Sequence, residues 1–211
     1  MLKQLILIRH PEVEWKNIKN PESSDSEGRL MGSTDVPLSK TGQAHAKRIA
    51  YFLKNLKPQK IYSSPLIRAN TTAKLINGVT RKKILNNDLL KEINFGNCEG
   101  MTFNNLSKKF PDIAKKYLDC SLDIAFPQGE SLSDFRKRIG VFADTVIKKE
   151  NGIVVVVTHG GVIRSLLCHL LGLDDDFIWK IKQDYGAINI LSPMGNGFII
   201  ERLNYTTKWQ K

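Results

Sequence analysis

The sequence has only three cysteines and no long apolar run. Cys98, Cys120 and Cys168 are far apart and form no Cys-x-x-Cys pair, which argues against a disulfide framework or a zinc site. The apolar stretch that follows Lys3 is too short for the core of a secretory signal, and no segment approaches the length of a membrane span. We therefore expect a cytoplasmic protein with reduced thiols and no membrane partner.

Glycine-rich and cysteine-based phosphate loops are also missing. The chain has no Gly-x-x-x-x-Gly-Lys-Ser/Thr loop and no Gly-x-Gly-x-x-Gly loop, and no arginine follows a cysteine at the spacing of a cysteine-based phosphatase. No His-Glu-x-x-His or comparable ligand set is present, so we expect neither a catalytic metal nor a cofactor. Histidine chemistry remains as the alternative.

Acidic residues are under-represented: 21 Asp and Glu stand against 32 Lys and Arg, which gives a formal net charge of +11. Basic surfaces attract polyanions such as nucleic acids. Here, however, the lysines occur as scattered pairs, with no basic tail and no interleaved aromatic side chains. We therefore expect no nucleic-acid partner and interpret the charge as favouring solubility and small anionic substrates.

The length of 211 residues and the spacing of apolar residues predict a single α/β domain covering 1–211. Unalternated apolar runs at 5–8 and 153–157 are typical of strands buried on both faces of a parallel sheet. Between them we expect a helix before Pro58, a strand at 61–62 and a helix whose N-cap is Ser64. The alternation indicates a three-layer α/β/α sandwich with a mostly parallel central sheet.

Residues 88–130 have a mixed pattern, which predicts an insertion beside the sheet and the active site, with a helix at about 104–118. Ser131 and Asp134 resemble a capping box at the start of a helix whose apolar stripe continues to Val146. A further helix is expected from Gly161 to Leu171, and two strands at 187–191 and 198–203 are expected to form a terminal hairpin.

Two histidines directly follow the two buried runs. Arg9-His10 comes after the first run and Thr158-His159 after the second, so both histidines are expected at the carboxyl edge of the sheet. Ligands of open α/β sheets bind at that edge. Neutral imidazole has an ordinary pKa near 6.5 and is a nucleophile at cytoplasmic pH.

Phosphoryl transfer requires an in-line nucleophile, cations around the equatorial oxygens and an acid for the leaving group. Arg9, Arg68 and His159 can supply cationic donors. The helix that opens at Gly160-Gly161 adds N–H groups and the positive end of its dipole. The sequence therefore predicts a site for a phosphoryl group.

Six segments carry recognisable motifs, among them Leu-Ile-Arg-His-Pro-Glu, Ser-Ser-Pro-Leu-Ile-Arg-Ala and Thr-His-Gly-Gly; they lie at 7–12, 28–44, 63–69, 90–96, 127–131 and 158–164. In this order they resemble the motifs of the histidine phosphatase superfamily, in its phosphoglycerate-mutase-like branch. The resemblance covers about residues 3 to 200, and six separate matches in order make coincidence very improbable.

The resemblance implies a role for each central residue. His10 would be the nucleophile that is phosphorylated, and Arg9, Arg68 and His159 would bind the phosphoryl group, with Gly160 beside them. Glu92, in a Leu-x-Glu-x-x-x-Gly segment, would be the acid.

Three positions depart from the family pattern. Pro11 replaces the usual glycine after the nucleophile, which fixes φ and removes an N–H that could have faced the phosphate. Val13 replaces a common threonine, and Lys16 stands where asparagine often contributes, with Asn17 one place on. These differences affect the near wall of the predicted pocket.

Other residues compete for these roles. Glu12, Glu99 and Glu130 are alternatives to Glu92 as the acid, and Glu130 is also interpreted as part of a helix start. Possible substrate contacts are Lys16, Asn17, Arg29, Ser33 and Thr34, with Lys16 and Arg29 alternatively interpreted as solvated loop charges.

Three residues without a supporting motif are expected to be structural. His45 and His169 lie on predicted helices, and Cys98 is expected to be half-buried beside the site.

The predicted function is metal-independent hydrolysis of a small phosphomonoester through a phosphohistidine, by a monomer or homodimer. The chain length and the His-Pro-Glu-Val sequence resemble α-ribazole phosphatases, which implies α-ribazole 5′-phosphate of cobalamin synthesis as substrate. A phosphoglycerate mutase is the alternative within the family. From another class, Pro11 and Lys16 would suit a phospho-ligand-binding protein that has lost turnover.

Overall fold

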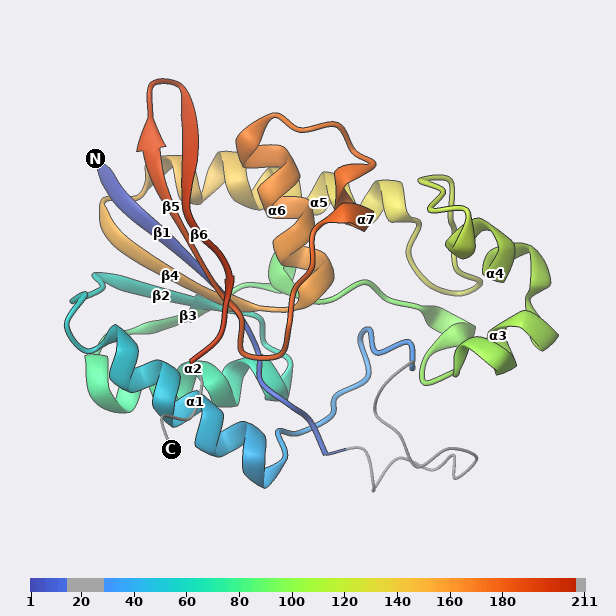
Figure 1. Ribbon diagram of the computed structural model, residues 1–211, viewed down its shortest axis with the longest axis horizontal. Helices are drawn as coiled ribbons and strands as arrows, with labels where there is room; N and C mark the ends of the chain where they lie inside the picture. The colour runs from blue at the N-terminus through green and yellow to red at the C-terminus, as the bar shows by residue number, and fades with distance from the viewer. Residues whose placement is uncertain (15–28, 208–211) are drawn as a thin grey trace.

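A six-stranded sheet with the order β3-β2-β4-β1-β5-β6 forms the centre of the computed structural model, which describes residues 1–14 and 29–207 (Figure 1). The strands β1, β2, β3 and β4 are parallel to one another, β5 is antiparallel to β1, and β6 is antiparallel to β5. Their bounds are Leu2–Arg9 for β1, Lys60–Ser63 for β2, Ile84–Asn86 for β3, Gly152–Thr158 for β4, Ile188–Met194 for β5 and Gly197–Tyr205 for β6.

Helices cover both faces of this sheet. The helices α1 (Lys40–Leu53) and α2 (Ile67–Thr80) lie on one face, and α5 (Leu132–Thr145) and α6 (Gly160–Leu171) lie on the other (Figure 1). Strand side chains alternate between the two faces: Leu5 and Leu7 belong to the core under α5 and α6, whereas Ile6 and Ile8 belong to the core under α1 and α2. The predicted α/β/α sandwich is confirmed.

The helices α3 (Phe103–Lys109) and α4 (Pro111–Leu118) project beyond one end of the sheet (Figure 1). The prediction of one continuous helix at 104–118 was wrong. Phe110 has φ −137° and ψ 65°, outside the helical region, because the residue before a proline is driven away from helical geometry. Pro111 then begins α4 at a position where a missing N–H costs nothing.

The start of α2 also differs from the prediction. The helix begins at Ile67 with Leu66 as its N-cap residue, two residues after the expected Ser64 cap. The N–H of Ile67 is bonded instead to Oδ1 of Asp35, at 2.6 Å, so a residue from a distant loop satisfies the helix end. The Ser64 hydroxyl accepts the N–H of Leu66, at 3.3 Å, and is also bonded to His159.

Other local predictions are confirmed. Ser131 caps α5, its hydroxyl oxygen accepting the N–H of Asp134 at 3.0 Å. The terminal hairpin is present as β5 and β6, although β5 continues to Met194. The edge strand β3 was not predicted, because three residues give too short a pattern.

Three 3₁₀ turns, at Asp88–Leu90, Gly96–Cys98 and Ile147–Lys149, and the four-residue helix α7 at Phe177–Lys180 complete the described elements. The predicted insertion at 88–130 contains two of these turns together with α3 and α4. No helix within residues 1–14 and 29–207 is long and apolar enough to cross a membrane.

Candidate active site

The register of the two central strands brings the two motif histidines together. β1 and β4 are parallel neighbours in which Arg9 pairs with Thr158, and His10 donates its backbone N–H to the carbonyl of Thr158 at 2.9 Å. The rings of His10 and His159 therefore leave the same sheet edge, with centroids 5.2 Å apart in an edge-to-face arrangement. Both residues are buried, with 1% and 0% of their surface exposed.

A single hydrogen bond sets the tautomer of His10. Its Nδ1 lies 2.8 Å from the carbonyl oxygen of Pro11, and a carbonyl oxygen can only accept. The proton of the neutral ring is therefore on Nδ1, and Nε2 carries the lone pair. Burial, together with the positive charges of Arg68 and Arg9, lowers the pKa of His10 well below its ordinary 6.5, against the raising effect of the Pro11 carbonyl. The ring is thus neutral and nucleophilic at Nε2.

The other histidine uses both ring nitrogens within the protein. Nδ1 of His159 accepts from Nε of Arg68 at 3.2 Å, so Nε2 carries the proton and donates to the Ser64 hydroxyl at 2.8 Å. Burial, followed by the positive charges of Arg68 and Arg9, lowers the pKa of His159 well below 6.5. The sequence expectation of a cationic donor at this position therefore differs from the neutral ring found here.

Arg68 is fully buried in the first turn of α2. Beyond its bond to His159, it donates to the carbonyl oxygens of Thr34, at 2.7 Å, and Gly32, at 2.6 Å. Burial lowers its pKa, opposed first by the negative charge of Glu92. A guanidinium has five N–H groups, so two remain for a ligand after these three bonds.

Arg9 is the cation that directly lines the cavity beside His10. Its Nη1 donates to the carbonyl of Gln183 at 2.5 Å, and its guanidinium lies 4.1 Å from the ring centroid of Tyr185. Its Nε is buried and has no hydrogen-bond partner among the described residues. A Cβ on Gly160 would lie 3.4 Å from that nitrogen, so the start of α6 lies next to the Arg9 guanidinium.

Glu92 lies in the same cavity as His10. Its Oε2 accepts the N–H of Gly161 at 3.0 Å, at the start of α6, and its Oε1 accepts the N–H of Ile93 at 3.1 Å. A Cβ on Gly161 would stand 2.5 Å from Oε1, so only glycine lets the carboxyl group approach this closely.

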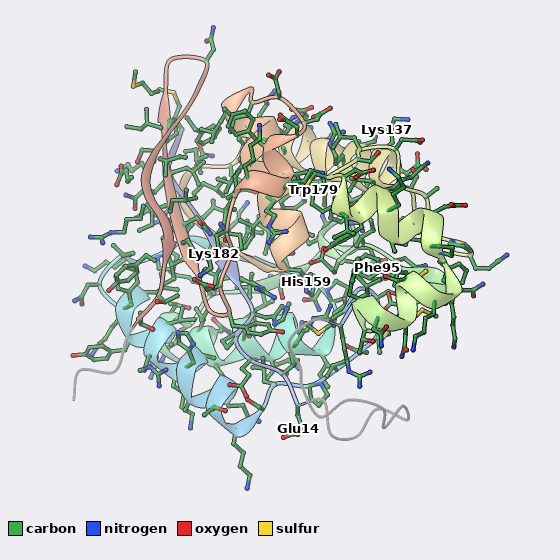
Figure 2. All side chains as sticks on the ribbon, turned by 45° about the vertical axis from the view of Figure 1, so that its right-hand side comes forward. Glu14, Phe95, Lys137, His159, Trp179 and Lys182 are labelled. Atoms are coloured by element: carbon green, nitrogen blue, oxygen red, sulfur yellow. The ribbon has the colours of Figure 1, made fainter. Side chains whose placement is uncertain are left out.

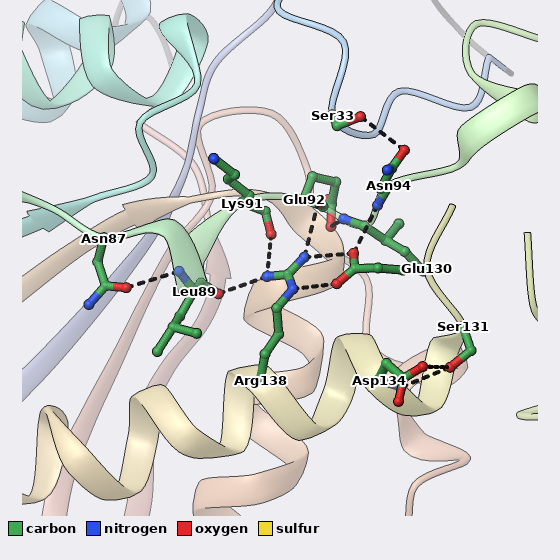
Figure 3. Close-up of polar contacts among 11 residues, drawn as sticks. Ser33, Asn87, Leu89, Lys91, Glu92, Asn94, Glu130, Ser131, Asp134 and Arg138 are labelled. Atoms are coloured by element: carbon green, nitrogen blue, oxygen red, sulfur yellow. Dashed lines mark hydrogen bonds and ion pairs between the residues drawn. The ribbon is translucent and has the colours of Figure 1, made fainter. Parts of the chain in front are cut away.

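An ion pair holds the segment that carries Glu92. Arg138 of α5 binds Glu130 in a bidentate pair, with Nε to Oε1 at 2.6 Å and Nη2 to Oε2 at 2.9 Å (Figure 3). The same guanidinium donates to the carbonyl oxygens of Leu89, Lys91 and Glu92. Sequence reasoning missed Arg138. The available signal was an arginine seven residues after Ser131, on the helix that follows a motif segment.

The competing glutamates have other partners. Glu99 accepts from the backbone N–H groups of Gly32, Ser33 and Thr34 and from both hydroxyls of that loop, so it organises residues 32–34. Glu12 is exposed and accepts from the Thr41 hydroxyl at 3.3 Å. Of the four candidate acids, the structure places Glu92 alone among the residues that line the cavity.

The remaining predicted contacts are divided. Arg29 lines the cavity and donates to the carbonyl of Gly100 at 2.9 Å. Ser33 and Thr34 direct their hydroxyls to Glu99 and do not line the cavity. Lys16 and Asn17 lie outside the described residues.

His45, His169 and Cys98 also lie outside the cavity lining. His169 is bonded to Asp144 at 3.0 Å on the helical surface. Cys98 is fully buried and not half-buried as expected, because its side chain belongs to the core under α5 and α6. The three cysteines are free thiols, as expected.

The cavity has a volume of about 380 Å³ and extends from His10 toward the α3–α4 region. Figure 2 labels His159, next to His10, and the cavity residues Phe95 and Trp179. Most of its walls are apolar or aromatic, including Phe95, Tyr117, Phe126 and Trp179. Sequence reasoning missed these wall residues. Within the described part of the chain, no three His, Cys, Asp or Glu side chains are placed to hold a metal ion.

The family model of the histidine phosphatase superfamily (branch 1) matches residues 5–206. Phosphoserine phosphatase 1 of Hydrogenobacter thermophilus is 31% identical over 204 residues, which are 96% of this chain and 92% of that protein. Phosphoglycerate mutase-like protein 4 of Arabidopsis thaliana is 34% identical over 167 residues, 77% of this chain and 69% of that protein. The crystal structure of the α-ribazole phosphatase from Shigella flexneri has a TM-score of 0.81 at 23% identity and covers 96% of both chains.

Proposed function

The chain belongs to the histidine phosphatase superfamily (branch 1), and we propose that it hydrolyses phosphomonoesters through a phosphohistidine formed on His10. Membership supports phosphatase activity on a small phosphorylated metabolite. The observation that carries the proposed mechanism is the bond from Nδ1 of His10 to the Pro11 carbonyl, because it leaves the Nε2 lone pair free for attack.

In the first step, Nε2 of His10 attacks phosphorus and the ester P–O bond breaks. Glu92 gives its proton to the departing oxygen, so the leaving group departs as a neutral alcohol. Arg9, with an unpartnered Nε, and Arg68, with two N–H groups left, stabilise the charge on the equatorial oxygens. The positive end of the α6 dipole adds to the same positive field.

In the second step, Glu92 accepts a proton from water, and the resulting nucleophile attacks the phosphohistidine. The P–N bond breaks, inorganic phosphate leaves and His10 regains its lone pair. The neutral ring of His159 acts by positioning: it joins Arg68 to Ser64 directly beside His10. The chain's own side chains provide the nucleophile, the cations and the acid, which supports metal independence.

For the substrate, we propose a phosphate ester whose alcohol carries an apolar ring system, with α-ribazole 5′-phosphate as the first compound to test. The support is the lining of the cavity, where Phe95, Phe126 and Trp179 offer faces and edges on which such a ring can pack. The 31% identical phosphoserine phosphatase makes O-phosphoserine the second compound.

The test of the reaction is covalent trapping. Brief exposure of the protein to a ³²P-labelled phosphomonoester should give an acid-labile, alkali-stable label on the wild type and none on His10→Ala. His169→Ala is the matched control, because this histidine lies on the helical surface away from the cavity. Turnover by His10→Ala above about a thousandth of the wild-type rate would place the nucleophile elsewhere.

A chelator provides the second arm of the test. Activity should persist in excess chelator, since the proposed steps use side chains alone. Inhibition that is reversed by adding zinc or magnesium would contradict the metal-independent mechanism.

A further inference from the structure

The cavity contains more positive charge than a single phosphoryl group uses. Among the described residues that line it, Glu92 is the only acidic one, whereas three are arginines: Arg9, Arg29 and Arg164. Arg9 lies beside His10 at the phosphoryl end. Arg164 has no place in the phosphohistidine chemistry, although its positive charge is close enough to contribute to lowering the pKa of Arg9, after burial.

Arg164 lies on α6, one turn after the glycines that begin the helix. Positions three and four residues apart share a helix face, so Arg164 lies on the same side of α6 as Gly160 and Gly161. It lines the cavity together with these glycines. A substrate whose phosphoryl group occupies the start of α6 therefore extends its leaving group past Arg164.

Unlike Arg9, Arg164 has no hydrogen-bond or ion-pair partner among the described residues, and its Nε is buried. A buried donor without an acceptor has lost its hydrogen bonds to water and gained nothing in exchange. Such a group is stabilised when a ligand supplies the acceptor, and a cation is stabilised most by an anionic one.

A second donor in the cavity is in the same state. The indole Nε1 of Trp179, on α7, is buried and has no partner in the described part of the chain. The indole is held by Tyr117 of α4 in an edge-to-face contact with ring centroids 5.1 Å apart. Two unpartnered donors, from α6 and α7, therefore line a wall that is otherwise apolar.

We propose that Arg164 and Trp179 form a second polar subsite, which binds a hydrogen-bond acceptor on the leaving group of the substrate. This inference rests on the proposed phosphatase function and narrows the substrate class. The alcohol carries an apolar body that packs between Phe126 and Tyr117 and an acceptor at its far end. An anionic acceptor such as a carboxylate binds most strongly.

Matched aryl phosphates test this subsite without changing the chemistry of the leaving oxygen. The probes are 4-(phosphonooxy)phenyl-acetate, -propanoate and -butanoate, each compared with its carboxamide and with the 4-alkylphenyl phosphate of equal length. Three chain lengths are used so that one of them can match the distance between the phosphoryl site and Arg164. For at least one length, wild-type kcat/KM should follow the order carboxylate, carboxamide, alkyl, with about 10–100-fold between the first and the last, as expected for a hydrogen bond to a charged group.

The variants are Arg164→Met, which keeps the length of the side chain but removes its charge, and Arg164→Lys, which keeps the charge. Arg164→Met should reduce the carboxylate-to-alkyl ratio of kcat/KM to about one, and Arg164→Lys should restore part of it. Trp179→Phe, which lacks the indole N–H, should reduce the same ratio by a smaller factor. Arg202→Met, on the exposed strand β6, is the matched control and should keep the wild-type ratio.

Several outcomes would overturn the inference. An equal loss on all probes in Arg164→Met would assign Arg164 to the phosphoryl group, and an unchanged ratio would remove it from the leaving-group subsite. A wild type that hydrolyses the alkyl probes as fast as the carboxylates would also contradict the subsite while leaving the phosphatase function intact. Failure of the wild type on every aryl phosphate would instead contradict the proposed function itself.

Discussion

The two ends of the central strands β2 and β4 differ in whether their buried charged groups have a partner of opposite charge. At the amino end, the buried carboxylate of Glu150 is bonded to Lys60, at 2.8 Å, and to the hydroxyl of Tyr62, at 2.6 Å. Burial alone would raise the pKa of Glu150, but these two hydrogen bonds lower it below its ordinary value. Burial and the bond to Glu150 raise the pKa of Tyr62 to about 12. At this end, the buried negative charge is therefore balanced by a lysine and a hydroxyl of the protein itself.

At the carboxyl end, Arg9 and Arg68 lie close to two buried histidines, and neither arginine has a carboxylate within ion-pair distance in the described part of the chain. Burial first, and then the positive charges of Arg68 and Arg9, lowers the pKa of both histidines. Buried positive charge without a counter-ion is unfavourable in the free protein. This difference supports the proposal that the phosphoryl group binds at the carboxyl end of the sheet.

Replacing the acid should produce the largest change at the carboxyl end. Glu92→Gln should lower the rate on alkyl phosphates by about 10²–10⁴, the range of a positioned general acid. An aryl phosphate needs little protonation of its leaving oxygen, so its first step should be affected much less. Rapid-quench kinetics should show a burst of phenol followed by slow turnover, with phosphohistidine accumulating. Equal losses on both substrate types, with no burst, would assign Glu92 a structural role.

Removing a cation should have the next largest effect. Arg68→Ala should lower kcat/KM by roughly a hundredfold, because a buried donor aimed at a developing charge contributes strongly. It should also lower stability, since the bonds to His159, Thr34 and Gly32 are lost. Arg68→Lys should recover only part of the activity, because an ammonium group lacks the planar fork. Steady-state kinetics and urea unfolding of both variants would separate the two effects, and wild-type activity of Arg68→Ala would contradict its role.

A methyl group at the start of α6 should displace the acid without unfolding the protein. In Gly161→Ala the added carbon meets the flexible end of Glu92, 2.5 Å away, whereas in Gly160→Ala it stands at an ordinary 3.4 Å from Arg9. We expect a loss of roughly tenfold in kcat for Gly161→Ala and a smaller loss for Gly160→Ala, since small misplacements of reacting groups are costly. Thermal unfolding should be similar for the two. A larger loss in Gly160→Ala would place the critical contact at Arg9.

The two ends should also lose stability in different pH ranges. Because the folded state holds His10 and His159 neutral, the unfolded state binds more protons once the pH falls below the ordinary histidine value of 6.5, and stability decreases from there. Glu150 has a lowered pKa, so its contribution is lost only as the pH falls below its ordinary value of 4.5. Urea unfolding of the wild type and of His10→Ala across pH 4 to 8 should show a shallower decline for the variant between 6.5 and 4.5. Parallel curves would contradict the neutral His10.

The position of the site was predictable because its elements are local. Apolar runs without alternation mark β1 and β4, and the residues that follow them in a parallel sheet share one edge, which brought His10 and His159 together. The choice of Glu92 as the proposed acid could not be made from the residues alone. Glu130 lies in a motif segment, as Glu92 does, and Glu99 lies just after the segment that holds Glu92. Only the folded chain shows that the 32–34 loop binds Glu99 and that Arg138 binds Glu130.

By itself, then, the sequence determined the α/β/α order and predicted the nucleophilic histidine and the class of chemistry, because these depend on the periodicity of apolar residues and on motifs of adjacent residues. The tertiary structure decided the protonated nitrogen of His10, the neutral state of His159 and the composition of the cavity. These depend on contacts between residues far apart in the chain, such as Arg68 with His159 and Tyr117 with Trp179, which leave no pattern in either local segment. The same is true of Arg164, whose lack of a partner among the described residues can be seen only in the folded chain.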